Sequence, residues 1–218
     1  VKSVEASLTY TERRNQAIAH KTDSHDAFCV AKVLLNQLDT LPDATMNDDS
    51  WTLQLLVSRR NAIVKVRTAL KNQVHSYITH HYPSYRQFFT ETYCKTGMEF
   101  FQKYPSPSKL KGVGKEELGE FLYNESSGFF GINQAEKILL LIKRDGDTST
   151  EYQETRDFIV SHCIKEIKHC YEELKAIEYE IKNHMKQFPY KLETMPGIDT
   201  ITAAMLISEI GDIKRFAS

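Results

Sequence analysis

Two long stretches of the sequence repeat apolar residues at intervals of seven, and this repetition constrains the fold more than any other feature. The first stretch runs from Trp51 to about Tyr82 and ends before Pro83, which cannot continue a helix. A seven-residue repeat turns one apolar face of a helix towards a partner helix. The repeated positions in this stretch are Leu56, Ile63, Leu70 and Tyr77, with Val66 at the intervening position.

The second stretch lies near residues 155–188, where apolar residues step by threes and fours and only Glu178 interrupts them. Two helices of about 30 residues with this pattern predict a coiled-coil arm. The arm is either folded back on itself or shared with a second copy of the chain. The apolar positions of the second stretch are Val160, Ile164, Ile167, Tyr171, Leu174, Ile181, Met185 and Phe188.

The remaining segments indicate shorter elements, so the predicted fold class is mainly α. Glycine and proline punctuate residues 84–147, which predicts short helices and loops between the arm helices. An amphipathic helix is expected from Ser24 to a stop near Pro42, followed by an acidic connector over 43–49. Residues 1–22 are short and mixed in character, and we expect one edge strand there at most.

Composition excludes several classes of protein. The 218 residues include 28 basic and 29 acidic side chains, and 41% are hydrophobic, so neither a disordered polymer nor a generic basic nucleic-acid coat is expected. The longest apolar runs fall far short of the roughly 20 residues that span a bilayer, so we expect no membrane partner. No two of the four cysteines are close in sequence, which predicts free thiols in a reducing, cytoplasmic compartment. They are Cys29, Cys94, Cys163 and Cys170.

Asp23 and Asp26 stand at the head of the predicted helix that follows residue 22. Carboxylates three positions apart fall on one helical face, where they can share a hard cation such as Mg²⁺. Such a pair forms half of a two-metal site for phosphodiester chemistry. Helix capping explains the same residues without a metal, with Asp23 as N-cap and Asp26 in the first turn. Spacing alone favours capping.

A charge asymmetry is hidden by the near-zero net charge. Residues 51–90 contain six basic side chains and no Asp or Glu. On a helix this composition predicts a basic stripe suited to a phosphate backbone, with no preference for base sequence. A solvated helix face is the alternative, although such faces usually mix both signs. The candidate nucleic-acid-binding residues of this stripe are Arg59, Arg60, Lys65, Arg67 and Lys71.

The segment Met195-Pro196-Gly197-Ile198 predicts a tight turn in front of a helix rich in small residues. This arrangement is typical of a helix-hairpin-helix, in which backbone amides hold a DNA phosphate. The carboxylate of Asp199 would repel a phosphate, so a plain corner between two helices is an equal alternative.

A weaker candidate surrounds Gly112 and Gly114. Lys111 and Lys115 flank this Gly-x-Gly turn at a predicted helix start, which is suited to phosphate binding. The segment lacks the Gly-Lys-Ser/Thr ending of a P-loop, so no nucleotide site is predicted.

Three motifs occur in a fixed order. The first is Lys-Thr-Asp-x-x-Asp-Ala over 21–27, the second is the basic helix that opens with Leu-Gln-Leu-Leu-Val-Ser-Arg-Arg over 53–60, and the third is Met-Pro-Gly-Ile over 195–198, followed by Ile-Gly-Asp-Ile-Lys-Arg-Phe over 210–216. Together they resemble the DEDD-type transposases of insertion-sequence family one-ten, relatives of the Piv invertases. The resemblance covers nearly the whole chain.

The resemblance implies three domains. Residues 1–45 would be the C-terminal part of a RuvC-like (RNase H-like) domain, 46–188 the coiled-coil arm with inserted short helices, and 189–218 the start of a transposase domain with a helix-hairpin-helix. Family members recombine DNA under the guidance of a structured bridge RNA. The resemblance therefore implies DNA and guide RNA as partners, a dimer or tetramer formed through the arm, and a prokaryotic, nucleoid-associated location.

The resemblance also assigns Asp23 and Asp26 to the last two acids of a catalytic metal quartet that holds Mg²⁺. The other two acids would precede Val1, and the family's nucleophilic serine would follow Ser218. We therefore expect an internal piece of a transposase that does not exchange strands alone. A non-enzymatic helical module for nucleic-acid binding and oligomerisation is the alternative.

Overall fold

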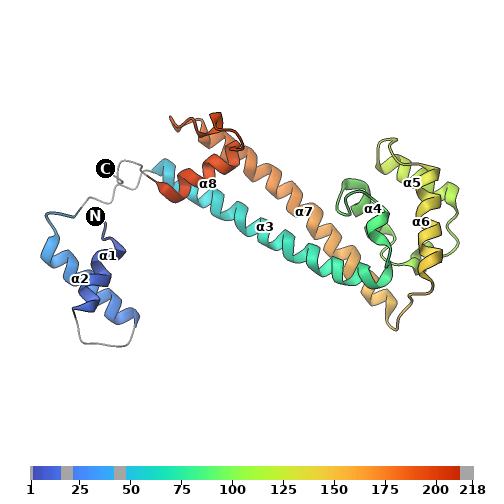
Figure 1. Cartoon of the computed structure of the whole chain (residues 1–218), viewed down its shortest axis with the longest axis horizontal. Coiled ribbons are helices and arrows are strands. Elements are labelled where there is room, and N and C mark those ends of the chain that lie inside the picture. The colour runs from blue at the N-terminus through green and yellow to red at the C-terminus, as the bar shows by residue number, and fades with distance from the viewer. Residues whose placement is uncertain (1, 16–21, 42–47, 212–218) are drawn as a thin grey trace. The chain divides into compact units, whose positions relative to one another are not determined.

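In the computed structural model of the chain, residues 2–15, 22–41 and 48–211 are described, and their regular elements are all helical. The mainly α prediction is therefore confirmed for the described residues. The chain divides into two compact units, residues 1–52 and 53–218, which are coloured along the chain in Figure 1. Within the described ranges, no helix is both long and apolar enough to cross a bilayer.

The first unit is built from α1 (Ala6–Arg14) and α2 (Asp23–Gln37). The predicted edge strand is wrong, because residues 6–14 form a helix whose last turn carries Arg13 and Arg14 beside the exposed carbonyls. Two ion pairs join the helices. Arg13 Nη2 lies 2.6 Å from Asp26 Oδ1, and Lys32 Nζ lies 2.5 Å from Glu12 Oε1.

α2 ends at Gln37, somewhat before the expected stop, and Pro42 lies outside the described residues. Most of the expected acidic connector is likewise outside them, apart from Asp48 and Asp49, which form the first turn of the next helix.

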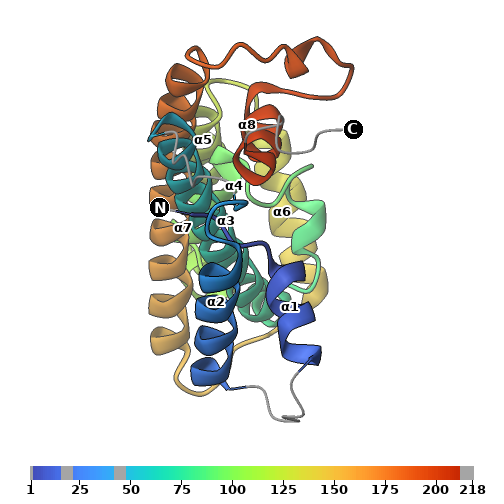
Figure 2. The ribbon, with the colours of Figure 1, turned by 90° about the vertical axis from the view of Figure 1, so that its left-hand side faces the viewer.

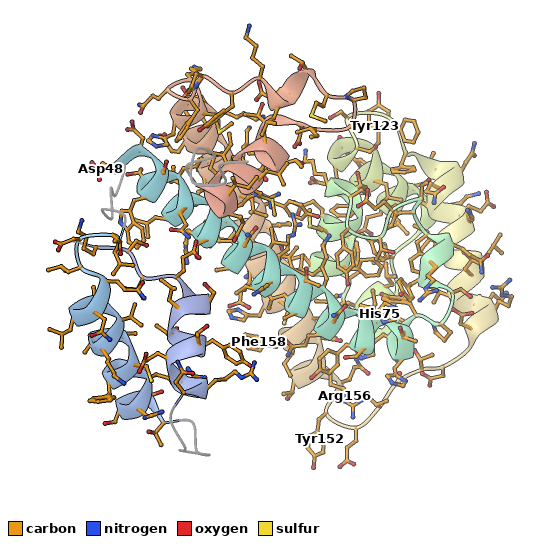
Figure 3. All side chains as sticks on the ribbon, turned by 60° about the vertical axis from the view of Figure 1, so that its left-hand side comes forward. Asp48, His75, Tyr123, Tyr152, Arg156 and Phe158 are labelled. Atoms are coloured by element: carbon orange, nitrogen blue, oxygen red, sulfur yellow. The ribbon has the colours of Figure 1, made fainter. Side chains whose placement is uncertain are left out.

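The second unit is dominated by two long helices, α3 (Asp48–His81) and α7 (Gln153–Met185). Arg60 of α3 contacts Glu178 of α7, and Lys71, further along α3, contacts the earlier residue Tyr171. The two helices therefore run antiparallel, and they lie side by side in Figures 1 and 2. Figure 3 shows His75, near the end of α3, and Phe158, near the start of α7, at the same end of the pair.

The apolar face of α7 is as predicted, whereas that of α3 is partly wrong. Val66 was expected to face a partner helix, yet 54% of it is exposed. The second contact position of each repeat instead lies four residues after Leu56 and Ile63. Arg60 and Arg67 occupy these positions and are half-buried. Charged side chains at these positions hid the second half of the repeat. The buried residues of α3 are Leu53, Val57, Ile63, Val74, Ile78 and His81.

Beyond the long helices, residues 84–147 form the short helices that the sequence predicts. They are η1 (Tyr85–Gln87), α4 (Lys95–Lys103), η2 (Pro107–Leu110), α5 (Lys115–Glu125) and α6 (Ile132–Asp145). These helices pack on the end of α3 and the start of α7 around a buried aromatic cluster, in which neighbouring ring centroids lie 5.2–6.4 Å apart. The most deeply buried rings of the cluster are Tyr82, Phe88, Phe100 and Phe101.

A buried polar network fixes the connection between α4 and α7. The carboxylate of Asp157 accepts hydrogen bonds from Ser106 Oγ at 3.0 Å and from Gln153 Nε2 at 2.8 Å. His81 Nδ1 lies 2.9 Å from the carbonyl oxygen of Pro105. Because a buried polar group without a partner is costly, these bonds hold residues 105–108 in one position against α7.

At the opposite end of the long helices, α8 (Thr200–Ile210) follows the short η3 (Leu192–Thr194). Ile201, Ala204 and Ile207 of α8 share a core with the start of α3 and the end of α7. The small alanine side chains let α8 approach closely. Asp199 caps α8, because its Oδ1 accepts a hydrogen bond from the backbone nitrogen of Thr202 at 2.7 Å.

Gly119 marks the closest approach of α5 and α6. A Cβ atom at this position would lie 2.9 Å from both Cα and Cγ1 of Ile132. At an open helical site, Gly→Ala stabilises by about 1 kcal/mol. We expect Gly119→Ala to lower the free energy of unfolding by about 1–3 kcal/mol instead, because the backbone of α6 must move. Urea unfolding measures this change, with Glu120→Ala on the exposed side of α5 as the control. A stabilised Gly119→Ala variant would contradict the close packing.

Hydrogen bonds from Thr202 hold the pKa of Asp199 below its ordinary value. A lowered folded-state pKa means that the cap stabilises above the unfolded-state pKa of about 3.9 and loses this contribution as pH falls. Asp199→Asn keeps an acceptor oxygen and does not titrate. We therefore expect the thermal midpoint of the wild type, relative to Asp199→Asn, to fall between about pH 5 and pH 3. A difference that is independent of pH would show that the carboxylate does not cap α8.

Candidate functional site

The acid-free stretch of α3 faces α7 across a cleft of about 1170 Å³. Its predicted nucleic-acid-binding residues are not equivalent in the structure. Three arginines of α3 line the cleft together with acidic and aromatic side chains of α7, while Lys65 is exposed to solvent. The arginines are Arg59, Arg60 and Arg67.

Two of these arginines form ion pairs with α7. Arg60 Nε donates a hydrogen bond to Glu178 Oε1 at 2.9 Å, and the two side chains are 22% and 32% exposed. Arg59 Nη2 lies 3.4 Å from Glu173 Oε2, and these side chains are 61% and 37% exposed. The Arg59 pair is longer and more exposed, so solvent screens it more strongly.

Two further predicted residues, Arg67 and Lys71, pack on Tyr171 of α7. Arg67 lies over its ring at 4.8 Å, and Lys71 Nζ donates a hydrogen bond to its hydroxyl at 2.8 Å. Lys71 also lies over the ring of Tyr93, whose hydroxyl donates to the carbonyl oxygen of Lys71 at 2.6 Å. Burial raises the pKa of Tyr93 well above its ordinary value, so this hydroxyl remains a donor. Lys71 is thus held from several sides.

The residues of α7 that meet the basic stripe were not predicted as part of a site. Glu173, Glu178 and Tyr171 contact the cationic groups that the α3 pattern singled out. One signal was present, because Glu178 was the single interruption in the apolar repeat of its helix. A charge placed at a helix–helix contact predicts an opposite charge on the partner, but the sequence does not say which one.

The weaker phosphate-binding candidate lies at the start of α5. Gly112 has φ +84°, Gly114 is the N-cap, and Lys111 and Lys115 are exposed. Lys115 Nζ lies 3.8 Å from Glu136 Oε1.

Lys111 acts on a neighbouring carboxylate. The pKa of Asp147 lies below its ordinary value, chiefly because Ser149 donates hydrogen bonds to it and to a smaller extent because of Lys111. The loop before α5 therefore presents cations beside acidic neighbours.

The turn at Gly197 precedes α8 as predicted, and its φ of +85° is a conformation that favours glycine. The helix before the turn is only the short η3. Asp199 occupies the amide of Thr202, which removes one of the backbone donors that a phosphate would use. The second half of the third motif, 212–216, lies outside the described residues.

Asp23 and Asp26 lie in the first turn of α2, but Asp23 is not its cap. Thr22 is the N-cap, and its hydroxyl accepts a hydrogen bond from the backbone nitrogen of His25 at 3.2 Å. Asp26 Oδ1 is in ion-pair contact with Arg13 at an angle that makes no hydrogen bond. Lys21, the first residue of the motif, lies outside the described residues.

The described residues alone do not complete a metal site. Nowhere in ranges 2–15, 22–41 and 48–211 do three His, Cys, Asp or Glu side chains form a group that could hold a metal ion. Mg²⁺ takes six oxygen ligands, so waters or phosphate oxygens would have to complete a sphere begun by two carboxylates, and Arg13 already pairs with one of the two. The arrangement supplies at most part of a coordination sphere.

Comparison with known families gives two matches. A DEDD-type IS110 family model described as "Transposase" matches residues 4–83, which include Asp23, Asp26 and the acid-free stretch of α3. A second model, described as "Transposase IS116/IS110/IS902 family", matches residues 190–218. No solved structure gives a significant match.

Two relatives extend the comparison. An "Insertion element IS110 uncharacterized 43.6 kDa protein" of Streptomyces coelicolor is 23% identical over 203 residues, which cover 90% of this chain and 49% of the relative. A "Transposase for insertion sequence element IS1328" of Yersinia enterocolitica is 43% identical over 49 residues, 22% of this chain and 15% of the relative. The chain thus spans about half the length of the longer match. It belongs to the IS110 family of insertion-sequence transposases.

Proposed function

We propose that this chain serves DNA transposition and site-specific recombination of an insertion sequence, and that α3 contacts the nucleic acid. The observation that carries the proposal is the run of α3 without any acidic residue, from which Lys65 and Arg59 reach solvent. Phosphate backbones attract such a surface irrespective of base sequence. Family membership supports DNA as the substrate.

The remaining basic candidates would make secondary contacts. Lys111 and Lys115 flank the glycine turn before α5, and Gly197 opens the turn before α8. Arg67 and Lys71 are better placed to position the arm than to bind a ligand, because both pack on Tyr171.

Asp23 and Asp26 are proposed as two catalytic metal ligands, with Mg²⁺ as the ion. Their support is the family match over 4–83 and their position on one face of α2. Arg13 would have to release Asp26 before that carboxylate could bind a cation. When bound, Mg²⁺ would polarise the phosphate that is attacked.

The proposal extends to the whole assembly. Residues 1–45 would belong to a RuvC-like domain, 46–188 to a coiled-coil arm that joins two or four copies, and 189–218 to a transposase domain with a helix-hairpin-helix. A structured bridge RNA would guide target choice in the bacterial cytoplasm, close to the nucleoid. A non-enzymatic binding module is the second candidate, favoured by the ion pair that already engages Asp26 with Arg13.

The nucleic-acid proposal predicts a salt-dependent interaction. Lys65→Gln should weaken binding to a duplex about equally for all sequences and lower the slope of log affinity against log salt by about one. Fluorescence anisotropy of labelled duplex DNA at several salt concentrations measures both quantities. Lys137→Gln, an exposed lysine of α6, is the control. Equal slopes for the two variants would remove α3 from the interface.

The metal proposal predicts that Asp23 and Asp26 coordinate Mg²⁺ rather than only contribute negative charge. In the element's transposase, Asp23→Asn and Asp26→Asn should each lower Mg²⁺-dependent strand cleavage by more than about a hundredfold, because even outer-shell substitutions cost about ten- to a hundredfold. Asp39→Asn removes the same charge from an exposed site just after α2 and should cleave normally. Full cleavage by the Asp23 and Asp26 variants would show that neither acid is a catalytic metal ligand.

A further inference from the structure

The cleft between α3 and α7 places carboxylates against the arginines that would meet a phosphate. Arg59 and Arg60 line it from α3, and Glu173 and Glu178 line it from α7. Each guanidinium contacts one carboxylate, at 3.4 Å for Arg59 and at 2.9 Å for Arg60. In the free protein, the guanidinium groups of Arg59 and Arg60 are therefore already occupied.

The chemistry of the two competitors is closely similar. A guanidinium binds carboxylate and phosphate oxygens through the same fork of N–H donors. The hydrogen bond to Glu178 comes from Nε of Arg60, whereas the contact to Glu173 is with Nη2 of Arg59. Glu173 and Glu178 thus stand where phosphodiester oxygens would stand in a complex.

The pairs are weak enough to exchange. Ion pairs between exposed side chains contribute little to stability, because water and salt screen them. Each phosphate contact also releases condensed counterions from the nucleic acid, which a carboxylate of the protein cannot provide. A phosphodiester backbone can therefore displace these glutamates, most readily Glu173 from the more exposed Arg59.

We propose that Glu173 and Glu178 are an autoinhibitory lock on the basic cleft: they hold Arg59 and Arg60 in the free protein and yield them to a phosphodiester backbone. The lock rests on the proposed contact between α3 and nucleic acid. The lock lowers the affinity of the free protein for non-specific polyanions. A ligand must therefore engage several cations of α3 at once to bind tightly.

The same helix offers a matched control. Glu172 and Glu180 also border the cleft, yet in the described part of the chain neither makes an ion pair with an arginine. Glu172→Gln with Glu180→Gln therefore removes the same two charges from the same region as Glu173→Gln with Glu178→Gln. Only the second combination releases Arg59 and Arg60.

The experiment measures the affinity of the whole chain for two labelled probes, a random-sequence DNA duplex and an RNA hairpin, by fluorescence anisotropy at low salt. The Glu173→Gln, Glu178→Gln protein should bind about threefold to tenfold more tightly than the matched control, as expected for the loss of two exposed pairs. Adding Arg59→Gln and Arg60→Gln should remove most of this gain, because both released guanidinium groups are then absent. Comparison of the two probes shows which phosphodiester backbone the cleft accepts. Circular dichroism checks that each variant is folded.

The outcomes separate the two proposals. Equal affinities of the paired and matched variants, with clear binding by the wild type, would overturn the lock and leave α3 as an interface. A gain that persists after both arginines are replaced would also overturn the lock, since no released guanidinium could then account for it. Absence of binding by every folded variant would overturn both the lock and the proposed nucleic-acid contact.

Discussion

The antiparallel packing of α3 on α7 is the constraint on which the second unit depends, and the contact between Arg60 and Glu178 marks its register. Each residue stands at a position of its helix that would otherwise be apolar, and each is only partly exposed. A shift of α3 along α7 by one turn would take Leu53 and Val57 at one end, and Val74 and Ile78 at the other, out of their apolar clusters, which costs far more than the pair contributes. The apolar ends therefore set the antiparallel register, and the pair can open without loss of the fold.

In this register, α3 and α7 make apolar contacts at both ends and mainly polar contacts in between. Leu53 and Val57 pack with α8 at one end of the long helices, and Val74 and Ile78 join the aromatic core at the other. Between the two ends the apolar contact narrows to a small cluster around Ile63 and Leu174. The ends hold the helices together, and the middle is free to carry arginines without loss of the fold. Structural and ligand-binding roles can therefore share one stretch of α3.

How far the sequence predicts this arrangement follows from the kind of signal each element carries. Periodicity located both long helices, because Pro83 and the heptads of apolar residues are local features. Periodicity wrongly predicted that Val66 contacts the partner helix. Arg60 and Arg67 occupy the contact positions, and a pattern of apolar residues does not identify charged residues as half-buried. The pairing of Lys71 with Tyr171, 100 positions apart, leaves no trace in either segment alone. At the candidate metal site, the carboxylates were evident but not Arg13, whose helix was not expected.

The net charge of −1 acquires a spatial meaning from the same contacts. The stretch of α3 without acidic residues faces carboxylates of α7 across the cleft. Part of the charge balance of this chain therefore lies within one cleft, where Arg59 and Arg60 each contact a carboxylate. A polyanion that approaches α3 meets a surface that is neutralised by exchangeable groups rather than bare. If α3 contacts nucleic acid as proposed, its affinity would depend on the strength of a few internal pairs, which neither the net charge nor the number of basic residues measures.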